Sequence, residues 1–169
     1  MSSAILDILG GALTVDKSGN LDRQDLEIIK RLAQDSRITM QELGNLVGLS
    51  STPCWNRMKA LESSGIIKKF GVTVDNAKLG YHQQIMVQIK LADHSDATVD
   101  GFQKGLHSIP EVTEAYLVSG SCDYLLKVVA KSTEDFEQLL RQKLAKLPGV
   151  QQTQCSIVFK TLKNCALPF

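Results

Sequence analysis

Three short segments in the first part of the chain carry apolar residues at helical spacing, and each predicts a short helix. The first covers residues 21–34, where Asp22 suits the N-cap position and an apolar face follows it. The second starts after Thr39, which has a glutamate three residues later in the capping-box arrangement, and it ends at Gly48. The residues expected to face inward from this second helix are Leu43, Leu46 and Val47.

The third predicted helix begins at Ser50 or Ser51 and is stopped by Gly65. Its apolar residues form one thin stripe, made of Cys54, Met58 and Leu61. The opposite side carries hydroxyl, amide and basic groups. Two short helices joined by a tight glycine turn, the second with a polar outer face, are typical of a helix-turn-helix. The following residues, 66–74, are β-rich and are expected to form a short strand or wing.

The alternative to a DNA-binding helix-turn-helix is an ordinary three-helix bundle whose third helix faces only solvent. The local charge distinguishes the two. The whole chain has a formal net charge of +1, which says little about its partners. From Arg37 to Gly71, however, five lysine and arginine residues stand against two glutamates. A local excess of positive charge beside a polar helix face favours binding to double-stranded DNA.

The second half of the chain contains an internal repeat with a period of 38 residues, seen in the matching segments IPEV at 109–112 and LPGV at 147–150. In each copy a strand-like run, 85–91 or 124–130, precedes an amphipathic helix, and Pro-x-Val then opens a second strand. This order predicts a ferredoxin-like split βαβ (βαββαβ) domain, so the fold class is α+β. The two copies meet at a turn over residues 119–123.

One face of such a sheet is left uncovered by its own helices. Because the strands contain many apolar residues, the sheet of another subunit is the expected cover, and we expect a homo-oligomer.

Several function classes are not favoured by the sequence. The four cysteines, at positions 54, 122, 155 and 165, form no CxxC pair, so we expect reduced thiols in a cytoplasmic protein and no metal site. No catalytic Ser/His/Asp or Cys/His arrangement and no phosphate-binding glycine loop is present, so we expect no enzyme. Residues 1–20 are too interrupted for a membrane span and lack the basic start of a secretory signal.

The spaced motifs together resemble the Lrp/AsnC (leucine-responsive, or feast/famine) transcription regulators. The matching residues are LSSTPC at 49–54, Arg57, Leu61, Glu62, Gly65, Ile67, the stretch from Val118 to Lys127, and LPGV at 147–150. The resemblance implies a DNA-binding regulator built as dimers that assemble into larger rings, usually octamers. It also implies an amino-acid or related small-molecule effector bound near the hairpin turn between subunits.

The organisation expected from these patterns has five parts. They are an N-terminal tail at 1–20, a winged helix-turn-helix DNA-binding domain at 21–74, a linker at 75–81, a ferredoxin-like effector-binding and oligomerisation domain at 82–160, and a C-terminal tail at 161–169.

The resemblance places the outer face of the third helix in the major groove of DNA. The residues expected at DNA are Ser51, Thr52, Trp55, Asn56, Arg57, Lys59, Lys68 and Lys69. Those expected to contact base edges are Thr52, Asn56 and Lys59. Those suited to phosphates, where charge matters more than base geometry, are Arg57, Lys68 and Lys69. Two alternatives stay open: Trp55 packs within the domain, and Arg57 forms an intradomain ion pair.

The residues expected at the effector are Leu117, Gly120, Ser121, Asp123, Thr153, Ser156 and Val158. Gly120 permits backbone conformations closed to other residues, and Asp123 can accept a hydrogen bond from an ammonium group. The alternative for Asp123 is a carboxylate that stabilises the turn through nearby backbone N–H groups. Cys122 stands where relatives often carry an aromatic or acidic residue, which leaves the identity of the effector open. No other cofactor is expected.

Two other functions stay open at this point. One is a mainly architectural protein that wraps DNA with little sequence preference. The other is a metabolite-binding interaction module that does not bind DNA.

Overall fold

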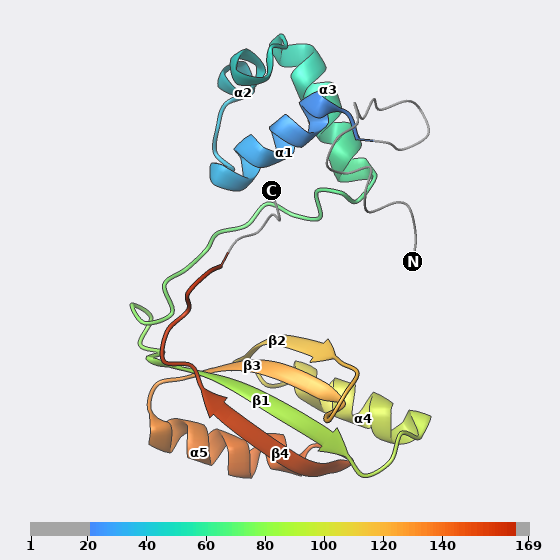
Figure 1. Ribbon diagram of the computed structural model, residues 1–169, viewed down its shortest axis with the longest axis vertical. Helices are drawn as coiled ribbons and strands as arrows, with labels where there is room; N and C mark the ends of the chain where they lie inside the picture. Colours follow the sequence, from blue (N-terminus) through green and yellow to red (C-terminus); the bar gives the residue numbers. More distant parts are fainter. Residues whose placement is uncertain (1–20, 165–169) are drawn as a thin grey trace. The chain divides into compact units, whose positions relative to one another are not determined.

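The computed structural model of the protein describes residues 21–164 (Figure 1). These residues fall into two compact units, one ending at Thr73 and the other spanning Val74–Lys163. The predicted N-terminal tail, 1–20, lies outside the described residues, as do residues 165–169 of the predicted C-terminal tail. Within residues 21–164 no helix is long and apolar enough to cross a membrane.

The first unit contains the three predicted helices, α1 (Arg23–Gln34), α2 (Met40–Val47) and α3 (Ser51–Ser63). Asp22 caps α1 and Thr39 caps α2, each through a reciprocal capping box. These bonds satisfy backbone N–H groups that the first helical turn leaves without partners. The N-cap of α3 is a serine whose side chain makes no capping hydrogen bond.

The apolar stripe of α3 is buried as predicted, and it joins α1 and α2 in one small core. The buried apolar residues of this core are Ile28, Leu32, Leu43, Cys54, Met58 and Leu61. The prediction for Leu46 is wrong, because that side chain is 51% exposed. Helix α2 has only eight residues, and its buried residues are Leu43 and Gly44, so Leu46 remains at the rim of the core.

The strand predicted over residues 66–74 is not formed in the described part of the chain. The segment has no regular secondary structure, and Phe70, Val72 and Val74 are exposed. A β-rich sequence becomes a strand only where a neighbouring strand pairs with it, and no described segment does so here.

The turn between α2 and α3 depends on a close approach of backbone to backbone. Gly48 ends α2 in the left-handed conformation, with φ of 73°, and the Leu49 N–H donates to the Gly44 carbonyl over 2.8 Å. A Cβ atom on Gly44 would lie only 2.6 Å from the Leu49 carbonyl oxygen. Gly44 therefore sets the closeness of α2 to the start of α3.

An ion pair also fastens α3 to the start of α1. Arg57 Nη1 lies 2.6 Å from Asp22 Oδ2 and 2.8 Å from Asp25 Oδ1, and Asp25 is 3% exposed. The two carboxylates are the same pair that forms the capping box of α1. One cluster thus completes the first turn of α1 and holds the middle of α3 against it.

The second unit is the predicted ferredoxin-like βαββαβ domain. Its elements are β1 (Gln83–Leu91), α4 (Asp96–His107), β2 (Val112–Leu117), β3 (Tyr124–Ala130), α5 (Thr133–Gln142) and β4 (Val150–Ile157), with a short 3-10 turn at Leu144–Lys146. The strands form one antiparallel sheet in the order β2-β3-β1-β4, with α4 and α5 on the same side of it (Figure 1).

The two faces of this sheet differ in chemistry. The helix-covered face carries the core residues Ile85, Val87, Ile89, Leu91, Leu126 and Val128, against Phe102 of α4 and Phe136 and Leu139 of α5. The alternating positions form the other side, called here the open face. Its residues include Gln84, Met86, Gln88, Lys90, Tyr116, Leu125, Lys127, Gln152, Gln154 and Ser156. Period-two alternation places most apolar strand residues against the helices, so the open face is mainly polar and the many apolar residues of the strands do not by themselves support the expected cover by another subunit's sheet.

We expect Gly44→Ala to lower the free energy of unfolding of the first unit by about 1–3 kcal/mol, because the new methyl group overpacks against the Leu49 carbonyl. Urea titration followed by the fluorescence of Trp55, the one tryptophan in the chain, measures it. The matched control is Gly71→Ala, since a Cβ there meets nothing within 4 Å. Equal stability of the two variants would contradict the role given to Gly44.

We expect Asp22→Asn to lower stability at neutral pH by about 1 kcal/mol, because a partly buried bond to Arg57 is lost. Partial burial acts to raise the pKa of Asp22, but the Asp25 N–H and Arg57 outweigh it and hold that pKa below 3.8. The carboxylate therefore stabilises the fold above pH 3.8 and loses this effect as the pH falls further.

Unfolding measured from pH 7 to pH 2 tests this expectation. The wild type should lose more stability in acid than Asp22→Asn does. Asp100→Asn, a change on exposed α4 surface, is the control and should follow the wild type. Parallel curves for the wild type and Asp22→Asn would show that Asp22 does not contribute in this way.

Candidate nucleic-acid interface and effector site

The side of α3 opposite its buried stripe is solvent-exposed. The predicted DNA-binding residues that the structure brings together on it are Ser51, Thr52, Trp55, Asn56 and Lys59. They share this surface because helical residues three and four apart project from one side. The result is a surface of two hydroxyls, an amide, an indole and an ammonium group.

Lys59 is held in place on this surface by two neighbours. Its Nζ lies 2.7 Å from Glu62 Oε2 and 5.9 Å from the centre of the Trp55 ring. Trp55 remains 47% exposed, so the indole is only partly packed within the domain. A solvent-exposed ion pair of this kind is weak, and the Lys59 ammonium can exchange Glu62 for another anion or a base.

Arg57 occupies a different position from the other predicted DNA residues. Its guanidinium bonds to the carboxylates of Asp22 and Asp25. The bond to Asp25 has the largest effect on the pKa of Arg57, and together the two carboxylates raise this pKa, although partial burial acts to lower it. This geometry favours the intradomain ion pair over the predicted phosphate contact, because the donors facing α1 are already used.

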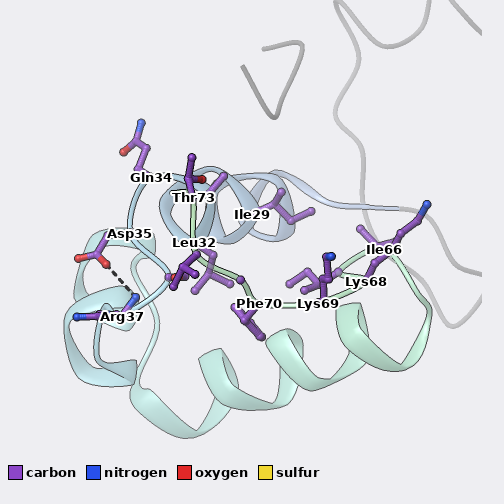
Figure 2. A pocket seen from close by; sticks show the side chains of 15 residues that line it. Ile29, Leu32, Gln34, Asp35, Arg37, Ile66, Lys68, Lys69, Phe70 and Thr73 are labelled. Atoms are coloured by element: carbon purple, nitrogen blue, oxygen red, sulfur yellow. Dashed lines mark hydrogen bonds between the residues drawn. The ribbon is translucent and has the colours of Figure 1, made fainter. Parts of the chain in front are cut away.

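The predicted phosphate ligands Lys68 and Lys69 lie off α3, on the extended segment after it. Together with the end of α1 and the following turn, this segment encloses a groove of about 650 Å³ (Figure 2). Apolar side chains including Ile29, Leu32 and Phe70 line it, beside the cationic Arg37, Lys68 and Lys69. No sequence pattern predicts this groove, because it arises from how residues 66–73 pack beside α1.

The predicted effector turn has the expected backbone. Gly120 has a φ of 131°, in the region that favours glycine. The Val118 N–H donates to the Asp123 carbonyl, and the Asp123 N–H donates to the Ile89 carbonyl of β1. The turn is therefore bonded both to itself and to the neighbouring strand.

The carboxylate of Asp123 is already occupied within the domain. Its Oδ2 accepts from the Leu91 N–H over 2.7 Å, and its Oδ1 lies 3.0 Å from His94 Nε2. The hydrogen bond from the Leu91 N–H has the largest effect on the pKa of Asp123, and the bond from His94 has the next largest. Together they hold this pKa below its usual value. These contacts favour the alternative in which the Asp123 carboxylate stabilises the turn. The backbone N–H that it accepts from belongs to Leu91 of β1 and not to the turn itself. No sequence signal pointed to His94, which the loop after β1 brings within 3.0 Å of this carboxylate.

The remaining predicted effector residues do not share one surface. Thr153 pairs with Ile89, on the helix-covered side, whereas Ser156 pairs with Met86 on the open face. Leu117 pairs with Tyr124, also on the helix-covered side, and is 76% exposed. Val158 donates its N–H to the Gln84 carbonyl at the far end of β1. Within one chain, the structure therefore does not bring these residues together, and the predicted site between subunits stays a prediction.

Of the predicted effector residues, Ser121 lines a small pocket on the open face, with a volume of about 150 Å³. Its lining residues are Gln88, Lys90, Ser121, Cys122, Gln152 and Gln154. The sequence signal for this pocket is the pair of polar residues at alternate positions in 88–90 and again in 152–154, because alternate strand residues lie on one face of a sheet.

The described residues hold no cluster of three or more His, Cys, Asp or Glu side chains placed to bind a metal ion. Cys54, Cys122 and Cys155 are free thiols, and Cys165 lies outside the described residues.

Comparison with known families agrees with both units. Residues 21–68 match the family model described as winged helix-turn-helix DNA-binding, and residues 84–167 match the Lrp/AsnC ligand binding domain. The proline dehydrogenase transcriptional activator of Rhizobium radiobacter is 32% identical over 89% of this chain and 97% of its own length. The transcriptional regulatory protein DoeX of Halomonas elongata is 36% identical over 85% of this chain and 91% of its own.

A solved structure is similar over most of the fold as well. A transcriptional regulator from Neisseria meningitidis, in complex with L-Met, has a TM-score of 0.83 and 30% identity, covering 88% of this chain and 96% of that one. These matches confirm the predicted resemblance and the winged helix-turn-helix plus α+β fold class. The chain belongs to the Lrp/AsnC family of transcription regulators, with a DNA-binding helix-turn-helix domain and a ligand-binding domain.

Proposed function

We propose that this protein is a sequence-specific DNA-binding regulator whose helix α3 enters the major groove. The observation that carries the proposal is the exposed polar side of α3, opposite a stripe that fastens the helix to its own core. Asn56 presents the amide group that pairs well with an adenine edge, and Lys59 suits the acceptors of guanine. Thr52 has a hydroxyl for either base and a methyl group that can contact thymine.

Phosphate contacts fall to Lys68 and Lys69 in this proposal. Both are exposed, and neither makes an ion pair with another described residue. Arg57 instead keeps α3 at a fixed position on α1, which matters because base readout depends on where the helix sits in the groove.

We expect Asn56→Ala to change base preference at one position of the binding site, by about 1–3 kcal/mol. Lys69→Gln should weaken binding to all sequences alike. It should also make the slope of log affinity against log salt concentration shallower by about one, because one counterion fewer is released. Fluorescence anisotropy on a duplex selected by the wild type from a random pool, repeated over a salt series, measures both effects.

Lys104→Gln, on exposed surface of α4, is the control and should leave both properties unchanged. Wild-type affinity and preference in Asn56→Ala would remove α3 from base readout. Failure of the selection to enrich any sequence would favour the architectural alternative.

We further propose that an amino-acid effector binds between subunits of a homo-oligomer, a dimer that assembles to an octamer. The match to the ligand-binding domain supports the effector, and so does the similar Neisseria regulator in complex with L-Met. The open face, which lies opposite the face that α4 and α5 cover, supports association through the second unit. Binding between subunits would couple the effector to the arrangement of the DNA-binding domains.

We expect the wild type to form dimers or larger assemblies at micromolar concentration, and Met86→Asp to form smaller ones. Met86 lies in the middle of the open face, and an unpaired carboxylate buried in an interface is costly. Multi-angle light scattering compares it with Gln103→Asp, which places the same charge on exposed α4 surface. A monomeric wild type, or an unchanged mass for Met86→Asp, would count against an interface on the open face.

A further inference from the structure

The small pocket on the open face is built almost entirely from polar side chains. Gln88 and Lys90 come from β1, and their register partners Gln154 and Gln152 come from β4. Ser121 and Cys122 of the hairpin turn close one end. Rigid strands thus fix four of its six lining residues, and the turn that β1 anchors supplies the other two.

The polar groups of this pocket have unused hydrogen-bonding capacity. Within the described part of the chain, the side chains of Gln88, Gln152 and Gln154 make no hydrogen bond, and Lys90 makes no salt bridge. Three carboxamides offer both donors and acceptors, and the lysine ammonium offers positive charge. No carboxylate is among the lining residues.

This chemistry selects between classes of amino acid. An apolar side chain would cover carboxamides and an ammonium group without replacing their hydrogen bonds to water, which is unfavourable. A side chain with a carboxylate or carboxamide satisfies them instead. The pocket's volume is about 150 Å³, below the roughly 300–1,000 Å³ of sites for drug-sized ligands, so it suits one small metabolite.

We infer that this pocket binds an amino acid with a carboxylate or carboxamide side chain, of the glutamate and glutamine type. Lys90 pairs with a carboxylate of the ligand, while the carboxamides of Gln88, Gln152 and Gln154 bond to its remaining polar groups. The inference rests on the proposed effector function and assigns its ligand class and site. The ammonium acceptor here is a glutamine oxygen, since Asp123 is engaged by Leu91 and His94.

Isothermal titration calorimetry of the full chain with glutamate, glutamine, leucine and methionine tests the inference. Glutamate or glutamine should bind at least about tenfold more tightly than leucine and methionine. Lys90→Met should weaken that binding about tenfold or more, because a charge-assisted bond is lost. Lys90→Arg keeps the positive charge and should stay within a few-fold of the wild type.

Lys104→Met is the matched control, because it removes an exposed lysine of the same unit that does not line the pocket. Circular dichroism and light scattering of each variant show whether fold and assembly are kept. If Lys90→Met does not fold, Gln152→Ala takes its place with the same expected direction.

Each other outcome overturns the inference. Tighter binding of leucine or methionine would reject the ligand class while leaving the proposed effector function standing. Unchanged affinity in Lys90→Met and Gln152→Ala would place the ligand elsewhere. If no amino acid binds, the effector function fails with the inference, whereas DNA binding by the ligand-free protein is measured separately and does not depend on either.

Discussion

The first unit depends on the contact between the Gly44 position and the Leu49 carbonyl. Because Gly44 has a hydrogen atom in place of a Cβ, the backbone at Leu49 can lie directly against α2. That approach fixes where α3 begins, and so which of its sides meets the core. The core is small, with six buried apolar residues among those described, and the Arg57 cluster adds a second attachment halfway along α3. A thin apolar stripe is then sufficient, and the rest of the helix surface is free for polar groups.

The second unit follows from a different constraint, the period-two alternation of its strands. One face carries the apolar side chains that α4 and α5 cover, while the open face carries glutamines and lysines with a few apolar residues between them. Covering such a face with a second subunit requires hydrogen bonds for the covered polar groups. The proposed association through it would therefore be more sensitive to bound polar ligands than association through an apolar interface.

The elements of the fold could be predicted because their signals are local. Helix caps such as Asp22 and Thr39, and the repeated Pro-x-Val segments, depend on residues close in sequence. The features that the sequence did not determine depend on distant partners. The strand over 66–74 lacks a described neighbour, and Asp123 receives its bonds from the end of β1 and the loop after it. Spacing identified the turn as a candidate site but did not show that its carboxylate was already bonded.

In the proposed homo-oligomer, an effector in the second unit alters DNA binding by favouring one arrangement of subunits over another. Within one chain, α3 is held by its own core and by the Arg57 cluster, and both belong entirely to the first unit. The residues that line the pocket beside Ser121 include none of these. In the proposed homo-oligomer, the effect of a bound ligand on α3 would pass through contacts between subunits, and it would equal the difference in ligand binding free energy between the assembled states.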